Sequence, residues 1–283
     1  MTQSQSHATV IDRPHLDLDG PRLSTALQTL IDGSEEHGGI ESYVEAVKLK
    51  TTLFQEALRE RDPEQLNLET FKGLCTFMAS VRRRVGIYLD EPMFFTMRSA
   101  IAELLADSRD TTASDTRINL FCDRFPQDKH HRWVRDLAAE ILHNTNPERY
   151  PLMSRWVWDA GSNSGVIREI WHGDNVDHIS IPVPDGYGTF IMLREELSQF
   201  LTHNGLFDDI LFYVDLLCAQ VYAGYICEQG NTYLRADFAT AEDPLTHTRR
   251  LLGLDGVKPG SGRTRLKTPG DDVFVIDDVR LLS

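Results

Sequence analysis

The sequence predicts a mostly α-helical protein: an α-rich α+β fold in which a helical bundle carries a small antiparallel β-hairpin or meander near its middle. Apolar residues recur every three or four positions over most of the chain, which is the helical period. Only the stretch from about 154 to 183 departs from it, with aromatic and β-branched runs around a glycine- and serine-rich segment. With 41% hydrophobic and 25% charged residues, the 283-residue chain can bury a substantial core.

Periodicity and capping signals place the helices in order. Asn67 can cap one helix, and Asp90 followed by Pro92 marks the start of the next, because a carboxylate accepts free amides and proline suits the first turn. Asp62-Pro63 separates two helices. The expected helices lie at about 21–33, 40–58, 67–84, 90–105, 114–124 and 128–144, and then at about 189–203, 206–228 and 243–253.

The predicted hairpin occupies the middle of the chain. Residues 155–158 and 166–171 are the strand candidates, and the turn candidate between them, 160–165, is built of glycine, serine and asparagine. A further strand is expected at 178–183, where Pro182 and Pro184 indicate a sheet edge. The organisation that follows is a flexible leader at 1–20, a single helical domain at 21–253 with the hairpin at about 154–183, and a polar C-terminal tail at 254–283.

Charge and cysteine content exclude several classes of protein. The formal charge of -14 repels phosphate backbones and anionic lipids, so general nucleic-acid or membrane binding is not expected. The four cysteines form no C-x-x-C pair, which favours reduced thiols in a cytoplasmic, soluble protein. The apolar stretch 206–227 contains Asp208, Asp209, Asp215 and Gln220, which predicts a buried helix, not a membrane span.

One short polar stretch, residues 172–178, gathers most of the candidate chemistry. His172, Asp174 and His178 offer imidazole and carboxylate groups that suit zinc, manganese or iron, and a strand would place them on one face. Asp159, His143 or Asp177 could complete such a divalent-metal site. An exposed turn is the competing and favoured interpretation, because glycine, aspartate and asparagine at 173–175 are preferred turn residues. No other cofactor is predicted.

Binding candidates come from the tryptophans and from one buried-looking carboxylate. Trp156 and Trp158 share a face of the predicted hairpin, and Trp171 lies on its return; they are either interface anchors or core. Asp215 interrupts the apolar helix and could help to form a small-molecule pocket with Tyr213, Tyr222 and Tyr225. A lone buried carboxylate must be paired or protonated.

Known catalytic motifs do not explain the chain. Residues 161–165 lack the strand and helix that flank a hydrolase nucleophile, and the glycines after 252 lack those of a phosphate loop. Residues 141–151 resemble a helix–loop stretch of some helix-hairpin-helix DNA-glycosylase relatives. The aspartate expected after it is replaced by residues 153–155 (Met-Ser-Arg), so neither activity nor site is carried over.

Three functions therefore remain, with catalysis left open. The first is a non-catalytic regulatory or accessory protein that acts through a protein partner or as a homo-oligomer. The second is a metal-dependent hydrolase or nuclease centred on residues 172–178, in which a metal would activate water. The third is a small-molecule binding protein.

Overall fold

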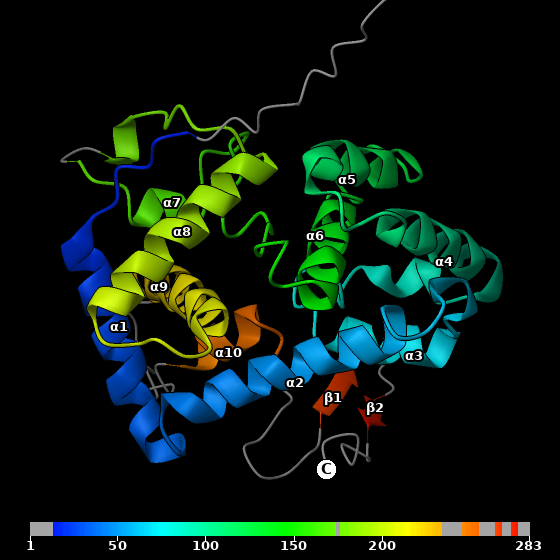
Figure 1. Ribbon diagram of the computed structural model, residues 1–283, viewed down its shortest axis with the longest axis horizontal. Helices are drawn as coiled ribbons and strands as arrows, with labels where there is room; N and C mark the ends of the chain where they lie inside the picture. The colour runs from blue at the N-terminus through cyan, green and yellow to red at the C-terminus, as the bar shows by residue number, and fades with distance from the viewer. Residues whose placement is uncertain (1–13, 174–175, 234–244, 255–263, 268–272, 277–283) are drawn as a thin grey trace, which may run out of the picture.

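The computed structural model of the protein describes residues 14–173, 176–233, 245–254, 264–267 and 273–276, and within them it confirms a mostly α-helical fold (Figure 1). Ten α-helices are described: α1 (Gly20–Ser34), α2 (Ile40–Leu58), α3 (Leu68–Thr76), α4 (Glu91–Leu105), α5 (Ser114–Asp123), α6 (Trp133–Thr145), α7 (Val166–Glu169), α8 (Tyr187–His203), α9 (Ile210–Tyr233) and α10 (Thr246–Leu251). Short 3-10 turns are η1 (Glu35–His37), η2 (Pro63–Gln65), η3 (Val85–Tyr88), η4 (Thr111–Ala113) and η5 (Val176–His178).

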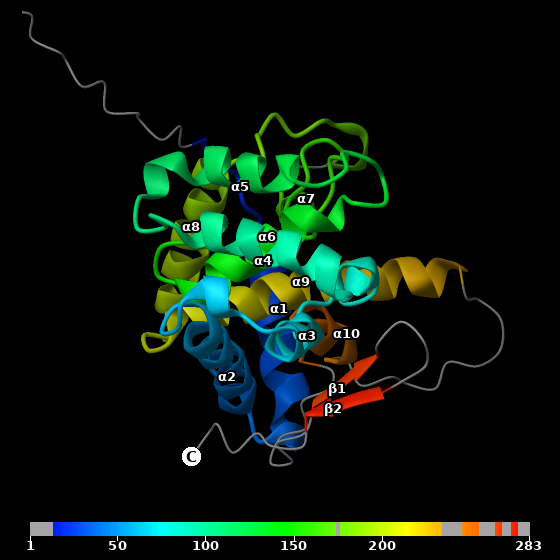
Figure 2. The ribbon, with the colours of Figure 1, turned by 90° about the vertical axis from the view of Figure 1, so that its right-hand side faces the viewer.

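The helices form two groups around two central helices. Helix α9 contacts α1, α2, α7, α8 and α10, while α6 contacts α2, α4 and α5. Long helix α2 runs under both groups and joins them (Figure 1). Helices α4 and α5 lie together on the side opposite to α9 (Figures 1 and 2). We call the boundary between the α6 group and the α9 group the seam; it crosses the middle of the molecule.

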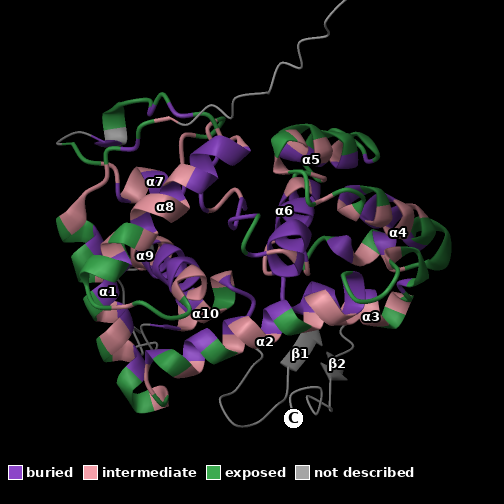
Figure 3. Cartoon of the chain, viewed as in Figure 1, coloured by how far each residue is buried: buried purple, intermediate pink, exposed green. Residues whose placement is uncertain are grey.

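Helix α6 and the middle of α9 are buried on all sides, unlike the amphipathic helices around them (Figure 3). Every residue of α6 except Arg135 is buried, and residues 213–221 of α9 are buried without a break. A helix that is covered all round belongs to the core of a protein or to a membrane. Within the described residues, Ile210–Glu228 is the one segment long and apolar enough to cross a membrane, and half of it is buried inside the protein.

Sequence signals located most helices correctly, and local capping explains where the boundaries differ. The side chain of Asn67 accepts the amide of Thr70 at 2.8 Å, so it caps α3 as predicted. The helix expected from 128 begins only at Trp133, because the carboxylate of Asp128 binds the amides of His130 and His131 and holds a turn there.

The predicted hairpin at 154–183 is wrong for the part of this segment that the structure describes. Only an isolated bridge joins Asp159 and Ser164, and the expected return strand is the one-turn helix α7. Gly165 turns the chain with φ +122, and its carbonyl accepts the amides of Arg168 and Glu169, which starts the helical turn. The apolar residues at 157–158 and 166–167 are fully buried, so no alternation between two faces distinguishes strand from helix here.

The two ends of the chain fall partly outside the described residues. Residues 1–13 of the predicted leader lie outside them, whereas Leu16 is buried and Leu18 forms an isolated bridge with Trp171. In the predicted polar tail, β1 (Thr264–Lys267) pairs antiparallel with β2 (Val273–Ile276), with Thr264 opposite Ile276. These are the strands of the described chain, and they lie near its end instead of near its middle.

Candidate functional site

Helix α6 carries a line of buried polar side chains through the core. Asp136, Glu140 and His143 follow one another at spacings of four and three residues, so they lie along one face of the helix. A buried charge is costly unless it is paired and hydrogen-bonded. Each of the three meets a partner of opposite charge from a different part of the chain.

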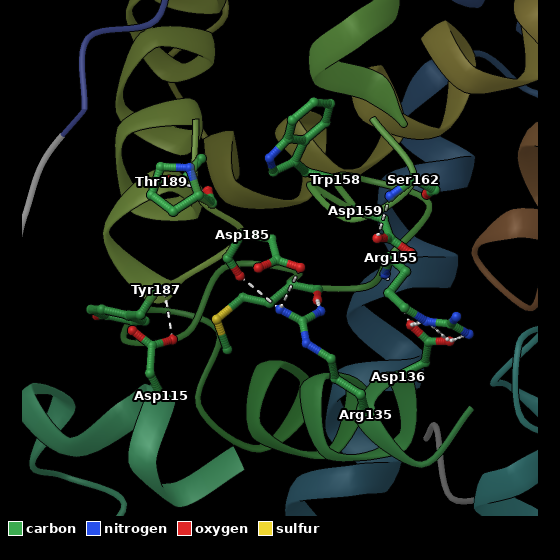
Figure 4. Close-up of polar contacts among 12 residues, drawn as sticks. Asp115, Arg135, Asp136, Arg155, Trp158, Asp159, Ser162, Asp185, Tyr187 and Thr189 are labelled. Carbon is green, nitrogen blue, oxygen red and sulfur yellow. Dashed lines mark hydrogen bonds and ion pairs between the residues drawn. The ribbon is translucent and has the colours of Figure 1, made fainter. Parts of the chain in front are cut away.

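The first pair fastens the segment after residue 150 to α6. The Asp136 carboxylate accepts the backbone amide of Arg155 at 2.9 Å and its guanidinium at 2.8 Å (Figure 4). The neighbouring Arg135 donates to the carbonyls of Met153 at 3.3 Å and Asp185 at 2.7 Å. Loop 153–185, which contains the region predicted as a hairpin, is thus held to α6 by side chains at both its ends.

Asp159 and Asp115 complete this polar network. Asp159 accepts the guanidinium of Arg132 at 3.0 Å and the amide of Ser162 at 3.1 Å, so it closes the turn beside α7. Asp115 of α5 accepts the first amide of α8, that of Tyr187, at 2.8 Å (Figure 4). Both carboxylates therefore stabilise the fold, because each accepts hydrogen bonds from other residues of the chain.

The second pair joins α2 to α6. The Lys50 ammonium donates to the Glu140 carboxylate at 2.8 Å, and the side chains are 4% and 1% exposed. Lys50 also donates to the carbonyl of Leu252 at 3.1 Å, while Asn144 donates to Glu140 at 3.2 Å. The buried lysine therefore ties the end of α10 to the centre of the molecule.

The third pair joins α6 to α9 across the seam. His143 places Nε2 at 2.9 Å from the Asp215 carboxylate and Nδ1 at 2.9 Å from the carbonyl oxygen of Tyr150. Burial lowers the pKa of His143, but the negative charge of Asp215 and the two hydrogen bonds outweigh it, and the pKa is raised. Asp215 and the two hydrogen bonds therefore favour the charged form of the imidazole.

A cavity lies beside this third pair, between α6, α8 and α9. It encloses about 330 Å³, including the solvent at its mouth, and its walls are apolar except for His143, Arg194 and Asp215. Its interior is narrow enough that it holds about one water molecule. None of its lining residues is a tyrosine, so the structure does not bring Tyr213, Tyr222 or Tyr225 to Asp215 in the predicted pocket.

The structure places the predicted metal ligands only in part. His172 and His178 are exposed, and His178 ends the short turn η5. Asp174 and the side chain of Asp177 lie outside the described residues. Among the described side chains, no group of three or more histidines, cysteines and acidic residues could hold a metal ion. His143 instead pairs with Asp215, and Asp159 pairs with Arg132.

The predicted tryptophan anchors separate into different environments. Trp158 is fully buried, and its indole N–H donates to the carbonyl of Val183 at 3.0 Å, so it belongs to the core. Trp171 is half-buried beside Leu18. Trp156 is also half-buried, and its ring lies 6.0 Å from that of Tyr222.

Trp156 belongs to a row of three aromatic side chains that the sequence did not bring together. The Tyr222 ring lies 5.7 Å from that of Tyr225, and the planes are tilted by 34° between Trp156 and Tyr222 and by 30° between the tyrosines. The tyrosines are three residues apart on α9, which places them on one helix face. We call Trp156, Tyr222 and Tyr225 the aromatic row. The spacing of the tyrosines was visible in the sequence, but their proximity to Trp156 was not.

Comparisons of the chain with protein-family models, with curated proteins and with solved structures find no match.

Proposed function

We propose that this protein is a non-catalytic regulatory or accessory protein of the cytoplasm that acts through protein–protein contacts, and that the aromatic row is its contact surface. The observation that carries the proposal is the row itself, three half-buried rings from two distant segments held side by side near the surface. Tryptophan and tyrosine dominate the energetics of protein interfaces, because they bring large apolar area together with a polar handle.

The position of the row on α9 also favours contact with a partner. The C-terminal part of α9 extends beyond the neighbouring helices (Figure 2). Gly224, between the two tyrosines, has nothing within 4 Å of where a Cβ would stand. A partner can therefore approach this part of the helix closely.

The buried charges favour a structural role over catalysis. A general base or nucleophile needs a free functional group within reach of a substrate. Asp136, Glu140 and Asp215 each accept from a cationic side chain, and the cavity beside Asp215 holds about one water molecule. These groups hold the fold together and offer no room for a metabolite.

The proposal is tested by photo-crosslinking in a cell extract with a benzophenone amino acid at position 225. Position 207 is the control, because Phe207 is also an aromatic side chain and is 71% exposed elsewhere. We expect a discrete crosslinked species from position 225 and none from position 207. In the otherwise unmodified protein, Tyr225→Glu should weaken the captured complex about tenfold or more, and Phe207→Glu should not.

The same experiment distinguishes a second copy of the chain from a different protein as the partner. If the crosslinked product is a homodimer, sedimentation velocity should show association that depends on protein concentration and is lost in Tyr225→Glu. The proposal is overturned if position 225 gives no product, or if Tyr225→Glu and Phe207→Glu weaken the complex equally.

A further inference from the structure

His143 connects the two segments that supply the aromatic row. Its Nδ1 contacts the carbonyl of Tyr150, which begins the loop leading to Trp156, and its Nε2 contacts Asp215, two helical turns before Tyr222. Both contacts are 2.9 Å long, and His143 and Asp215 are each buried to about 95%. One imidazole therefore spans the seam between α6, α9 and loop 150–156.

The number of protons on the His143 ring determines whether both of its contacts are hydrogen bonds. A backbone carbonyl and an ionised carboxylate only accept hydrogen bonds, so both contacts are hydrogen bonds only when both ring nitrogens carry protons. A neutral imidazole has one N–H and loses one of the two contacts. In that state, either the Tyr150 carbonyl loses its donor or the buried Asp215 carboxylate faces a lone pair.

Charged and titratable groups surround His143 and its partners on every side. They are Asp215 and Cys218 of α9, Arg194 and Tyr187 of α8, Glu140 of α6, Lys50 of α2, and Tyr150 of the loop. Lys50 neutralises Glu140, and burial raises the pKa of Cys218 so that it stays a thiol. Of the protonated groups, imidazolium is intrinsically more acidic than thiol, phenol, ammonium or guanidinium. As the pH rises, the first proton to leave this region is therefore that of His143.

We propose that the second proton of His143 acts as a latch for the contact surface. While the imidazole carries this proton, α6, α9 and loop 150–156 are held together and the aromatic row is assembled. When the proton dissociates, these contacts weaken and the aromatic row loosens. This inference rests on the proposed function, because it makes partner binding sensitive to pH. The latch opens as the pH rises through the pKa of His143, which lies above its usual value because the partners of His143 favour its charged form. Tyr222 does not interfere, because burial raises the pKa of its own phenol above the usual value.

The latch can be tested on the isolated full-length protein, without a partner. The protein is labelled with 5-fluorotryptophan, the Trp156 resonance is assigned with Trp156→Phe, and the His143 ring is followed by NMR on the same sample as the pH is raised. We expect the Trp156 resonance to move through a transition whose midpoint matches the titration of His143. In Asp215→Asn, which keeps the side-chain shape but removes the charge, this midpoint should fall by about 1–3 pH units.

His143→Gln removes the titrating group and should abolish the transition. The matched control is His131→Gln, because His131 also contacts a carboxylate at 2.9 Å, that of Asp128, but on the surface. This control should leave the Trp156 transition unchanged. If His143→Gln does not fold, the wild-type and Asp215→Asn titrations decide the question alone.

A Trp156 resonance that stays constant while His143 titrates would overturn the latch, as would a midpoint unmoved in Asp215→Asn. These results would leave the contact surface itself intact, because crosslinking at position 225 tests it independently. Conversely, a failed crosslink together with a coupled titration would remove the proposed function but not the pH-dependent movement.

Discussion

Replacing Lys50 by methionine should destabilise the protein by about 3–5 kcal/mol, because it leaves the Glu140 carboxylate buried without a cation. The Lys50 and Glu140 side chains are only 4% and 1% exposed, so water cannot take the place of the ammonium. The amide of Asn144, at 3.2 Å, is then the remaining side-chain donor to Glu140. The Leu252 carbonyl also loses its 3.1 Å hydrogen bond, which loosens the end of α10.

The loss of unfolding free energy in Lys50→Met can be measured by urea denaturation, with circular dichroism as the readout. A loss of this size corresponds to a fall in melting temperature of about 6–20 °C for a chain of this length. Lys72→Met is the matched control, because Lys72 and Glu69 are also 2.8 Å apart but are 23% and 65% exposed. An exposed pair contributes only about 0–1 kcal/mol.

The double variant Lys50→Met with Glu140→Leu separates the burial of a charge from the loss of packing. Replacing both members of a buried pair by apolar residues is often neutral or stabilising, so it should recover most of the loss. The reasoning is refuted if Lys50→Met costs no more than Lys72→Met. It is refuted as well if the double variant is less stable than Lys50→Met alone.

The free energy of unfolding should decline as the pH rises through the pKa of His143. A raised native pKa contributes its full stabilisation below the unfolded value of about 6.5, and this stabilisation is lost as the pH rises through the native pKa. Urea titrations that show equal stability below this unfolded value and under alkaline conditions would contradict the prediction. Gly253→Ala should destabilise by more than about 1 kcal/mol and by more than Gly205→Ala, as thermal melts can show. Both glycines have positive φ, but a Cβ would overlap a backbone carbonyl only at Gly253, and equal losses would count against this contact. Cys75 and Cys218 should resist a thiol reagent until the protein is denatured, because burial raises the pKa of both thiols; rapid modification of the native protein at either position would argue against this packing.

The helices were predictable because their signals are local. The Asn67 side chain caps α3 through a residue only three positions away, and the period of the apolar residues reports which face of a helix is covered. Where burial is complete, as at residues 157–158 and 166–167, the period carries no information. The sequence therefore predicted a hairpin where the backbone forms a turn and the single helical turn α7.

The amino-acid sequence by itself determined the helical class, the net negative charge and the presence of chemically capable side chains. Only the tertiary structure decided which of them meet. His143 and Asp215 are 72 positions apart, and Lys50 and Glu140 are 90 apart, so no local spacing indicates either pair. Trp156 and Tyr222 became neighbours for the same reason. Helix formation depends on residues within a turn or two of each other, whereas a buried ion pair or a surface row depends on how the finished helices pack.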